Sequence, residues 1–145
     1  MEEKLKHLDY LQNNVSRMNQ CSFQIKGLEI AIIAALLAIY ATSISTKEPA
    51  GNAIFIFVAV IPSLLFWILD SYYLAKERDY RRLYDLVADL DHSEKEIKPF
   101  CLDTSVLEDE QSGFFKTMWS ATESALYGSI IAGLFIFGFL IQFVF

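Results

Sequence analysis

The sequence predicts an all-α membrane protein with three transmembrane helices, an N-terminal amphipathic helix and a helical cytoplasmic extension of the second span. Hydrophobic residues make up 54% of the 145-residue chain. They gather in three blocks, Leu28–Ile44, Ala53–Leu69 and Ala125–Phe145. The first two blocks offer about 17 residues each and the third about 21. These lengths fall within the range needed to cross a hydrocarbon core of ~30 Å at 1.5 Å per residue.

A soluble helical bundle is the alternative explanation, and the third block argues against it. Only Tyr127, Ser129 and Gln142 interrupt its apolar residues, so no face remains for water. The first block could also belong to a signal peptide cleaved near Ala41. However, the segment before it is long and contains acidic residues, unlike the short basic region of such a peptide. We therefore expect an uncleaved first span.

Eleven of the 12 Lys and Arg residues lie on one side of the predicted spans, and only Lys47 lies on the other. Cytoplasmic loops are enriched in Lys and Arg. The N-terminus and the 71–124 region are therefore predicted to be cytoplasmic, with the C-terminus outside a bacterial inner membrane. Cys21 and Cys101 then share the reducing side, so no disulfide is expected.

Residues 1–26 are predicted to form the amphipathic helix. Its apolar positions recur at spacings of three and four, which is typical of a heptad seam. These positions are Leu8, Leu11, Val15, Met18, Ser22 and Ile25. The polar face lacks the excess of Lys and Arg that helices on anionic membranes carry. Packing against the cytoplasmic helix of the same or a neighbouring subunit is therefore favoured over lying on the bilayer.

Residues 27–70 are predicted to form a transmembrane hairpin of the first two spans. Small residues on one side of the first span and of the third let helices approach closely in lipid. They are Ala31, Ala34, Ala35, Ala38 and Ala41 in the first span, and Ala125, Ser129 and Gly133 in the third. This pattern does not distinguish packing within a subunit from packing between subunits. Pro62 clashes with the carbonyl of Val58, which predicts a kink in the second span.

Residues 71–124 are predicted to continue the second helix into the cytoplasm and then return to the membrane, where 125–145 form the third span. Glu77 and Arg81 are spaced for an i, i+4 ion pair. Ser105 matches the first residue of a capping box that would begin a short acidic helix. Its partner three residues later is Glu108. The aromatic residues expected to lie at the membrane interface are Phe114, Phe115 and Trp119.

Catalytic motifs are poorly represented, and an enzyme is not expected. His7 and His92 are far apart, and neither has a partner at metal-ligand spacing. The sequence contains no Gly-rich phosphate loop, Gly-x-Ser-x-Gly or Cys-x-x-Cys motif. Neither a cofactor nor a metal is therefore predicted. The net charge of −6 argues against binding of a nucleic-acid duplex.

Three carboxylates form the main candidate site. Glu29 begins the first span, Asp70 ends the second and Glu123 precedes the third, so the predicted topology places them at one cytoplasmic boundary. One interpretation is local pairing with a basic residue, because a charged group at membrane depth is costly. The basic candidates are Lys26, Arg78 and Lys116. The other interpretation is an acidic ring contributed by several subunits, which would favour cations at a pore mouth.

A second candidate site combines basic and aromatic residues just beyond the second span. Guanidinium groups beside aromatic rings can hold a phosphate and stack a base, as a nucleotide signal would require. The same pattern is also typical of residues that orient a helix and attract anionic lipid. Both interpretations stay open. The residues assigned to ligand or trigger binding are Arg78, Arg81, Arg82, Tyr73 and Tyr80.

Two stretches of the chain resemble a known group of proteins. They are Ser16–Gly27, with the sequence SRMNQCSFQIKG, and Phe66–Tyr84, with the sequence FWILDSYYLAKERDYRRLY. Over about the first 90 residues the chain resembles small bacterial three-span inner-membrane proteins of undetermined function. Its layout is also similar to that of SLATT-type transmembrane effectors of anti-phage defence. That likeness implies an oligomer that breaches the membrane when a cytoplasmic signalling protein or nucleotide triggers it.

These observations lead to one functional prediction and one alternative. The prediction is a homo-oligomeric inner-membrane protein that forms or gates an ion-conducting pore, with Glu29, Asp70 and Glu123 facing the ion. The helix that contains the three arginines would receive the trigger. The alternative is a membrane anchor or scaffold that conducts no ions and docks a cytoplasmic partner through Leu11 and Val15.

Overall fold

The computed structural model describes residues 2–44, 51–88, 97–110 and 113–144, and no β-strand occurs in these ranges. The helices are α1 (Glu2–Ser43), α2 (Ile54–Val58), α3 (Val60–Val87), the 3-10 helix η1 (Thr104–Glu110), α4 (Phe114–Met118) and α5 (Ala121–Val144). Within the described residues, three helical segments are long and apolar enough to cross a membrane. They are Glu2–Ser43, Ile54–Val87 and Ala121–Phe143. The prediction of three candidate spans is thus confirmed.

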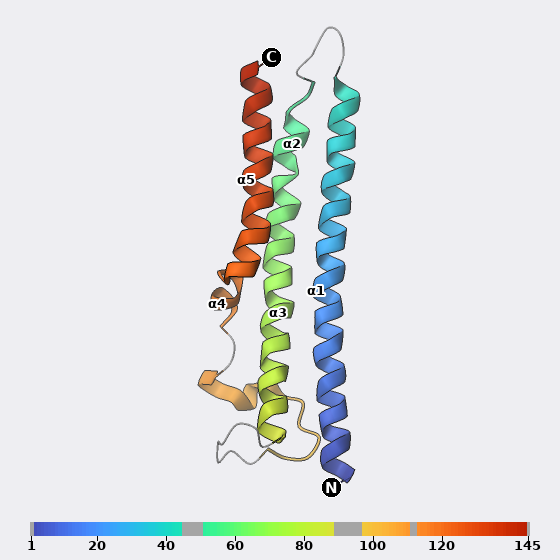
Figure 1. Ribbon diagram of the computed structural model, residues 1–145, viewed down its shortest axis with the longest axis vertical. Coiled ribbons are helices and arrows are strands. Elements are labelled where there is room, and N and C mark those ends of the chain that lie inside the picture. The colour runs from blue at the N-terminus through green and yellow to red at the C-terminus, as the bar shows by residue number, and fades with distance from the viewer. Residues whose placement is uncertain (1, 45–50, 89–96, 111–112, 145) are drawn as a thin grey trace.

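The three long helical segments lie side by side in an elongated bundle, with α3 between α1 and α5 (Figure 1). The N-terminus of α1 and the C-terminal end of α3 lie at the same end of this bundle, which we term the charged end. The C-terminus of α5 lies at the opposite end, beside α2. The chain therefore returns from the charged end through η1 and α4 before α5 runs the length of the apolar part.

α1 is one uninterrupted helix of 42 residues, so the predicted N-terminal helix and first span are continuous. It packs along α3 of the same subunit. Of the predicted seam, Leu8 and Met18 are half-buried. The buried seam residues are Leu11, Val15, Ser22 and Ile25. The buried apolar residues of α3 at the charged end are Ala75, Leu83 and Leu86. α1 and α3 thus form a two-helix stalk that extends beyond the apolar part.

The second span is interrupted between α2 and α3, at Ala59. Pro62 has no amide hydrogen, so the carbonyl of Val58, four residues earlier, loses its helical partner. Ala59 keeps helical backbone angles, with φ −64° and ψ −18°, and its amide donates to the Phe55 carbonyl at 3.3 Å. The interruption is one residue long and precedes Pro62 by three positions, and the kink predicted at Pro62 stays a prediction.

An apolar core lies between the three segments at the end opposite the stalk. Its buried members are Tyr40, Ile56, Ala59, Val60, Leu134 and Ile141. The close packing of α2 against α5 depends on Gly138. A Cβ added at Gly138 would lie 2.8 Å from Cζ of Phe57. Any larger residue at this position would therefore displace the Phe57 ring.

Replacing Gly138 with alanine is expected to destabilise the protein by about 1–3 kcal/mol, because the Phe57 ring must move away from the new methyl group. Gly128→Ala is the matched control, since a Cβ there meets nothing within 4 Å. Alanine is also the better helix former by about 1 kcal/mol. Equilibrium unfolding in detergent micelles would measure both variants. Equal stability of the two would contradict the contact between α2 and α5.

The segment before η1 is attached to the N-terminal part of α1. His7 Nε2 donates to the Cys101 carbonyl oxygen at 2.9 Å. η1 begins at Thr104, and Asp103 Oδ1 accepts the amide hydrogen of Ser105 at 2.9 Å. This hydrogen bond lowers the pKa of the Asp103 carboxyl group below its usual value. The predicted capping box, with Ser105 as its first residue, was wrong, because Asp103 caps a 3-10 helix that already contains Ser105.

Candidate functional site

Five polar side chains from three helices meet inside the bundle, and we term them the carboxylate cluster. They are Lys26 and Glu29 of α1, Asp70 of α3, and Glu123 and Tyr127 of α5. All except Lys26 are buried, with exposed fractions between 0 and 4%. The structure thus brings together the three carboxyl groups that the sequence placed at one boundary.

Helical spacing puts the cluster residues of each helix on one stripe, together with the side chains that neighbour them. Side chains three, four or seven positions apart lie on the same face of an α-helix. The stripes are Ser22, Lys26 and Glu29 on α1, Ser63, Trp67 and Asp70 on α3, and Glu123 and Tyr127 on α5. A single rotation of each helix about its axis therefore turns all the residues of its stripe toward the cluster.

The ammonium group of Lys26 links the three helices. It donates to Ser22 Oγ at 2.9 Å and to Asp70 Oδ2, and it lies 3.4 Å from Glu123 Oε1. An ammonium group has three hydrogens, so two are used by Ser22 and Asp70 and one is left for the ion pair with Glu123. The Lys26 side chain is 28% exposed, whereas that of Asp70 is fully buried. Lys26 is therefore the member of the cluster that reaches the surface.

Tyr127 completes the site from α5. Its hydroxyl donates to Asp70 Oδ2 at 2.8 Å. Its ring is parallel to that of Trp67, with centroids 6.1 Å apart and 7° between the planes. Trp67 is held in turn by its Nε1, which donates to the Met118 carbonyl at 3.2 Å. Sequence reasoning gave Tyr127 no role, although its position four residues after Glu123 was a signal that both share a face.

Negative charge exceeds positive charge in the cluster. Three carboxyl groups lie in the cluster with one ammonium group, which pairs with two of them, and one oxygen of each carboxyl group is buried without a hydrogen-bond partner. These atoms are Glu29 Oε1, Asp70 Oδ1 and Glu123 Oε2. Burying a charged group is costly unless an opposite charge or a hydrogen-bond donor compensates it. The site can therefore take up additional positive charge.

The contacts support local pairing for two of the three carboxylates. Lys26 pairs with Asp70 and Glu123. Glu29 faces the side chain of Ser63. Arg78 does not join the cluster, because its Nη1 donates to Thr117 Oγ1 at 3.3 Å and so links α3 to α4.

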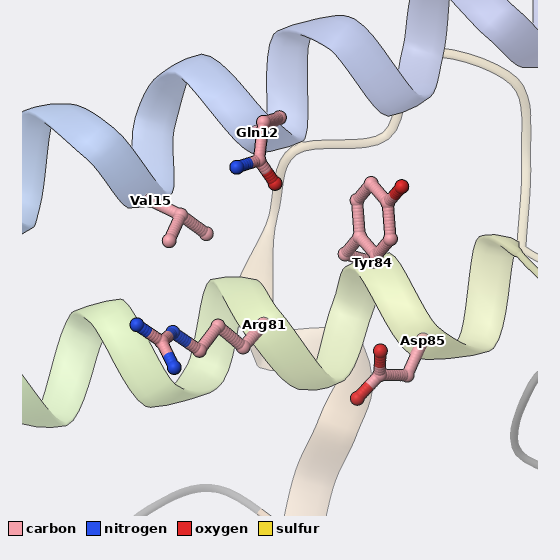
Figure 2. Close-up of a pocket in the computed structure, with 5 residues that line it drawn as sticks. All are labelled: Gln12, Val15, Arg81, Tyr84 and Asp85. Carbon is pink, nitrogen blue, oxygen red and sulfur yellow. The ribbon is translucent and has the colours of Figure 1, made fainter.

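A pocket of about 390 Å³ lies between α1 and α3 in the stalk (Figure 2). Its lining residues are Gln12, Val15, Arg81, Tyr84 and Asp85. Figure 2 shows Gln12 and Val15 on α1 opposite the α3 residues. The pocket thus offers an amide, a guanidinium group, an aromatic ring and a carboxylate, a set that suits a ligand with both donors and acceptors.

Of the predicted trigger-binding residues, Arg81 lines this pocket and the other four do not. Arg81 Nη2 lies 2.5 Å from Glu77 Oε1, which confirms the predicted ion pair. Arg82 is exposed on the surface. Tyr73 and Tyr80 are half-buried. No family model, curated protein or solved structure matches the chain.

Proposed function

We propose that the protein is a homo-oligomeric inner-membrane protein that gates an ion-conducting pore through the carboxylate cluster. The proposal is carried by one observation: three membrane-compatible helices each bury a carboxyl group in one cluster, and a single ammonium group pairs with two of the three. Ionisable residues within membrane segments are rare and costly, and they are typical of ion pathways and proton relays. Carboxyl groups in such a position favour cations.

Two exposed aromatic residues support a membrane boundary just beyond the cluster. Tyr72 and Trp119 lie on its stalk side and are 51% and 70% exposed, and both residue types are enriched at membrane interfaces. On the other side, about 30 Å of helix separates Glu123 from Phe143 at 1.5 Å per residue, which is close to the thickness of a hydrocarbon core. The amphipathic half of α1 and the extension of α3 would then lie in the cytoplasm.

The burial of the cluster favours a role in gating. None of its three carboxyl groups reaches the surface of the described subunit, so an ion could meet them only after α1, α3 and α5 move apart. Each of these helices contributes charge to the cluster, so a change of that charge alters the forces between all three. Opening would present Glu29, Asp70 and Glu123 to the ion.

The outward faces of α1 and α5 support assembly of several subunits. Small residues on these faces would let helices of neighbouring subunits approach closely in lipid. The exposed small residues are Ala31, Ala34, Ala35, Ala38 and Ala41 on α1, and Ala125, Ser129 and Gly133 on α5. Because these side chains are turned away from their own subunit, they are available for contacts between subunits.

The stalk is the proposed receiver of the trigger. The pocket beside Arg81 is formed by α1 and α3 together, and the same two helices carry Lys26 and Asp70. A nucleotide or signalling protein that changed their packing at the pocket would therefore act on the cluster. A membrane-disrupting effector of anti-phage defence would need such a connection between its cytoplasmic trigger and its membrane helices.

A membrane anchor or scaffold is the second candidate function. The heptad seam of α1, which the sequence suggested as a docking surface, is covered by α3. Its residues Leu11 and Val15 are only 0% and 7% exposed. Other apolar side chains exposed on the stalk favour this candidate. Leu5, Tyr10 and Phe100 are 58%, 52% and 46% exposed, and the rings of Tyr10 and Phe100 lie 6.2 Å apart. A cytoplasmic partner with an apolar surface would dock there.

Planar-bilayer recordings of the purified protein test the proposed function. The protein is expected to conduct with a preference for cations. Glu29→Gln should reduce that preference by about tenfold or more, because a charge ~4 Å from an ion contributes about 1 kcal/mol in bulk water and about 4 kcal/mol at an effective dielectric constant of about 20. Glu77→Gln is the matched control, since it removes a carboxylate of α3 outside the cluster.

Two results would contradict the proposal. One is wild-type protein that conducts nothing, which together with a stable partner complex would favour the scaffold. The other is unchanged selectivity in Glu29→Gln, which would remove the ion-facing role of that residue. Images of single detergent-solubilised particles should also show several subunits around an axis.

A further inference from the structure

The carboxylate cluster lacks one hydrogen-bond donor between α3 and α5. Asp70 Oδ2 accepts from both Lys26 and Tyr127, whereas Asp70 Oδ1 has no partner. Glu123 Oε1 faces Lys26 at 3.4 Å, whereas Glu123 Oε2 has no partner. The two carboxyl groups lie within hydrogen-bonding reach of each other. They therefore meet as two acceptors with no hydrogen between them.

The donors already in the cluster cannot supply this hydrogen. Lys26 donates to Ser22 and Asp70, and its remaining hydrogen serves the ion pair with Glu123 Oε1. The single hydroxyl hydrogen of Tyr127 is directed to Asp70 Oδ2. An ionised carboxyl group has only acceptors, and two ionised groups in contact repel each other. Within the described part of the chain the cluster offers no further donor, and a proton from water would fill this place.

We propose that Asp70 and Glu123 form a proton-binding site, in which one hydrogen is shared between Asp70 Oδ1 and Glu123 Oε2. A proton from water forms an O–H bond with one carboxylate oxygen, and that O–H donates to the other carboxylate. On release, the proton returns to water. Carboxyl pairs that share one proton are known from other proteins. The other titratable groups that face this pair are Lys26 and Glu29 on α1 and Tyr127 on α5.

A proton fits this site better than a metal ion. Across the described part of the chain, no three His, Cys, Asp or Glu side chains are arranged to hold a metal. Asp70 Oδ2 already accepts from two donors, so it is less available as a metal ligand. A hydrogen between two oxygen atoms needs no further ligands.

The proton would exchange with the cytoplasm past Lys26. The side chain of Lys26 is 28% exposed, whereas those of Asp70 and Glu123 are 0% and 5% exposed. Loss of the proton would leave two anionic groups in contact between α3 and α5. These helices would then separate at the level of the cluster, so the bound proton would hold the gate closed. This last step rests on the proposed function, whereas the proton site itself does not.

Infrared spectroscopy of the full-length protein in detergent at neutral pH tests the site. The C=O stretching band of a protonated carboxyl group is expected, and it should shift when D₂O replaces H₂O. Asp70→Asn and Glu123→Gln should each remove the band. Glu77→Gln should retain it, because Glu77 is paired with Arg81 outside the cluster. Tyr127→Phe keeps the ring but removes a donor to Asp70, so it should shift the band even if the other variants do not fold.

Three outcomes would overturn the proton site. They are absence of the band in the wild type, survival of the band in both Asp70→Asn and Glu123→Gln, and loss of the band in Glu29→Gln alone. The test is independent of conductance. A wild-type protein that shows the band but conducts nothing would support the proton site and overturn the proposed function. A wild-type protein that conducts cations but shows no such band would support the proposed function and overturn the proton site.

Discussion

Replacing Lys26 with methionine is expected to lower the free energy of unfolding by about 3–5 kcal/mol, because removing one partner of a buried ion pair leaves the other charged and unpaired. Both Asp70 and Glu123 lose their shared ammonium group in this variant. Methionine retains much of the length of the lysine side chain, so the loss reflects charge more than volume. Equilibrium unfolding in detergent micelles, followed by circular dichroism, would measure the change.

Lys6→Met is the matched control on the same helix. Lys6 pairs with Glu2 at 2.9 Å, but these side chains are 59% and 82% exposed, and exposed pairs at this spacing contribute only about 0.3–0.5 kcal/mol. The double variant of Lys26→Met with Asp70→Asn should lose less stability than the sum of the two single variants, because the residues are in contact. A loss no larger in Lys26→Met than in Lys6→Met would show that the buried ion pair is absent.

The three candidate spans and the meeting of the carboxylates were predictable because both depend on chain order and hydropathy. Apolar blocks of sufficient length identify helices that can cross a membrane. When successive helices run in opposite directions, residues at the same end of each span reach the same level. Glu29, Asp70 and Glu123 all lie at such ends, and the structure brings them together.

The rotation of each helix about its axis was not predictable. A helix that is apolar on all sides has no preferred face, and lipid is as apolar as leucine, so hydropathy does not show which side meets a neighbour. Ala35 and Gly133 are exposed, but the same sequence was equally compatible with their facing the interior. In the stalk, a polar face makes the rotation predictable, and the seam residues Leu11 and Val15 are indeed buried.

The incorrect cap has a local cause. Asp and Ser are both strong N-cap residues, and Glu108, three positions after Ser105, made Ser105 the better match to a capping box. The side chain of Asp103 nevertheless reaches the Ser105 amide. Two adequate caps two residues apart cannot be separated by pattern alone, because the choice depends on how the following turn packs.

Replacing Leu11 with alanine is expected to lower the free energy of unfolding by about 2–5 kcal/mol, the range for removing a buried leucine side chain. Leu11 and Leu83 are both 0% exposed, and they lie on α1 and α3 of the stalk. In the proposed topology this part of the chain lies in water, where the hydrophobic effect would act on it in full. A contact between helices in lipid lacks that driving force. Unfolding followed by circular dichroism would measure the loss.

Leu5→Ala is the matched control, because Leu5 is 58% exposed on the same helix and surface substitutions usually change stability by less than about 0.5 kcal/mol.

The pair of variants also separates the two candidate functions, the gated pore and the scaffold. If Leu11→Ala loses a cytoplasmic partner while its stability is unchanged, Leu11 contacts that partner and the packing of α1 on α3 is wrong. If Leu11→Ala loses stability and Leu5→Ala alone loses the partner, the partner docks on the exposed side of α1 that carries Leu5. Loss of stability without any effect on a partner would leave the stalk as a connection between the pocket and the cluster, as gating requires.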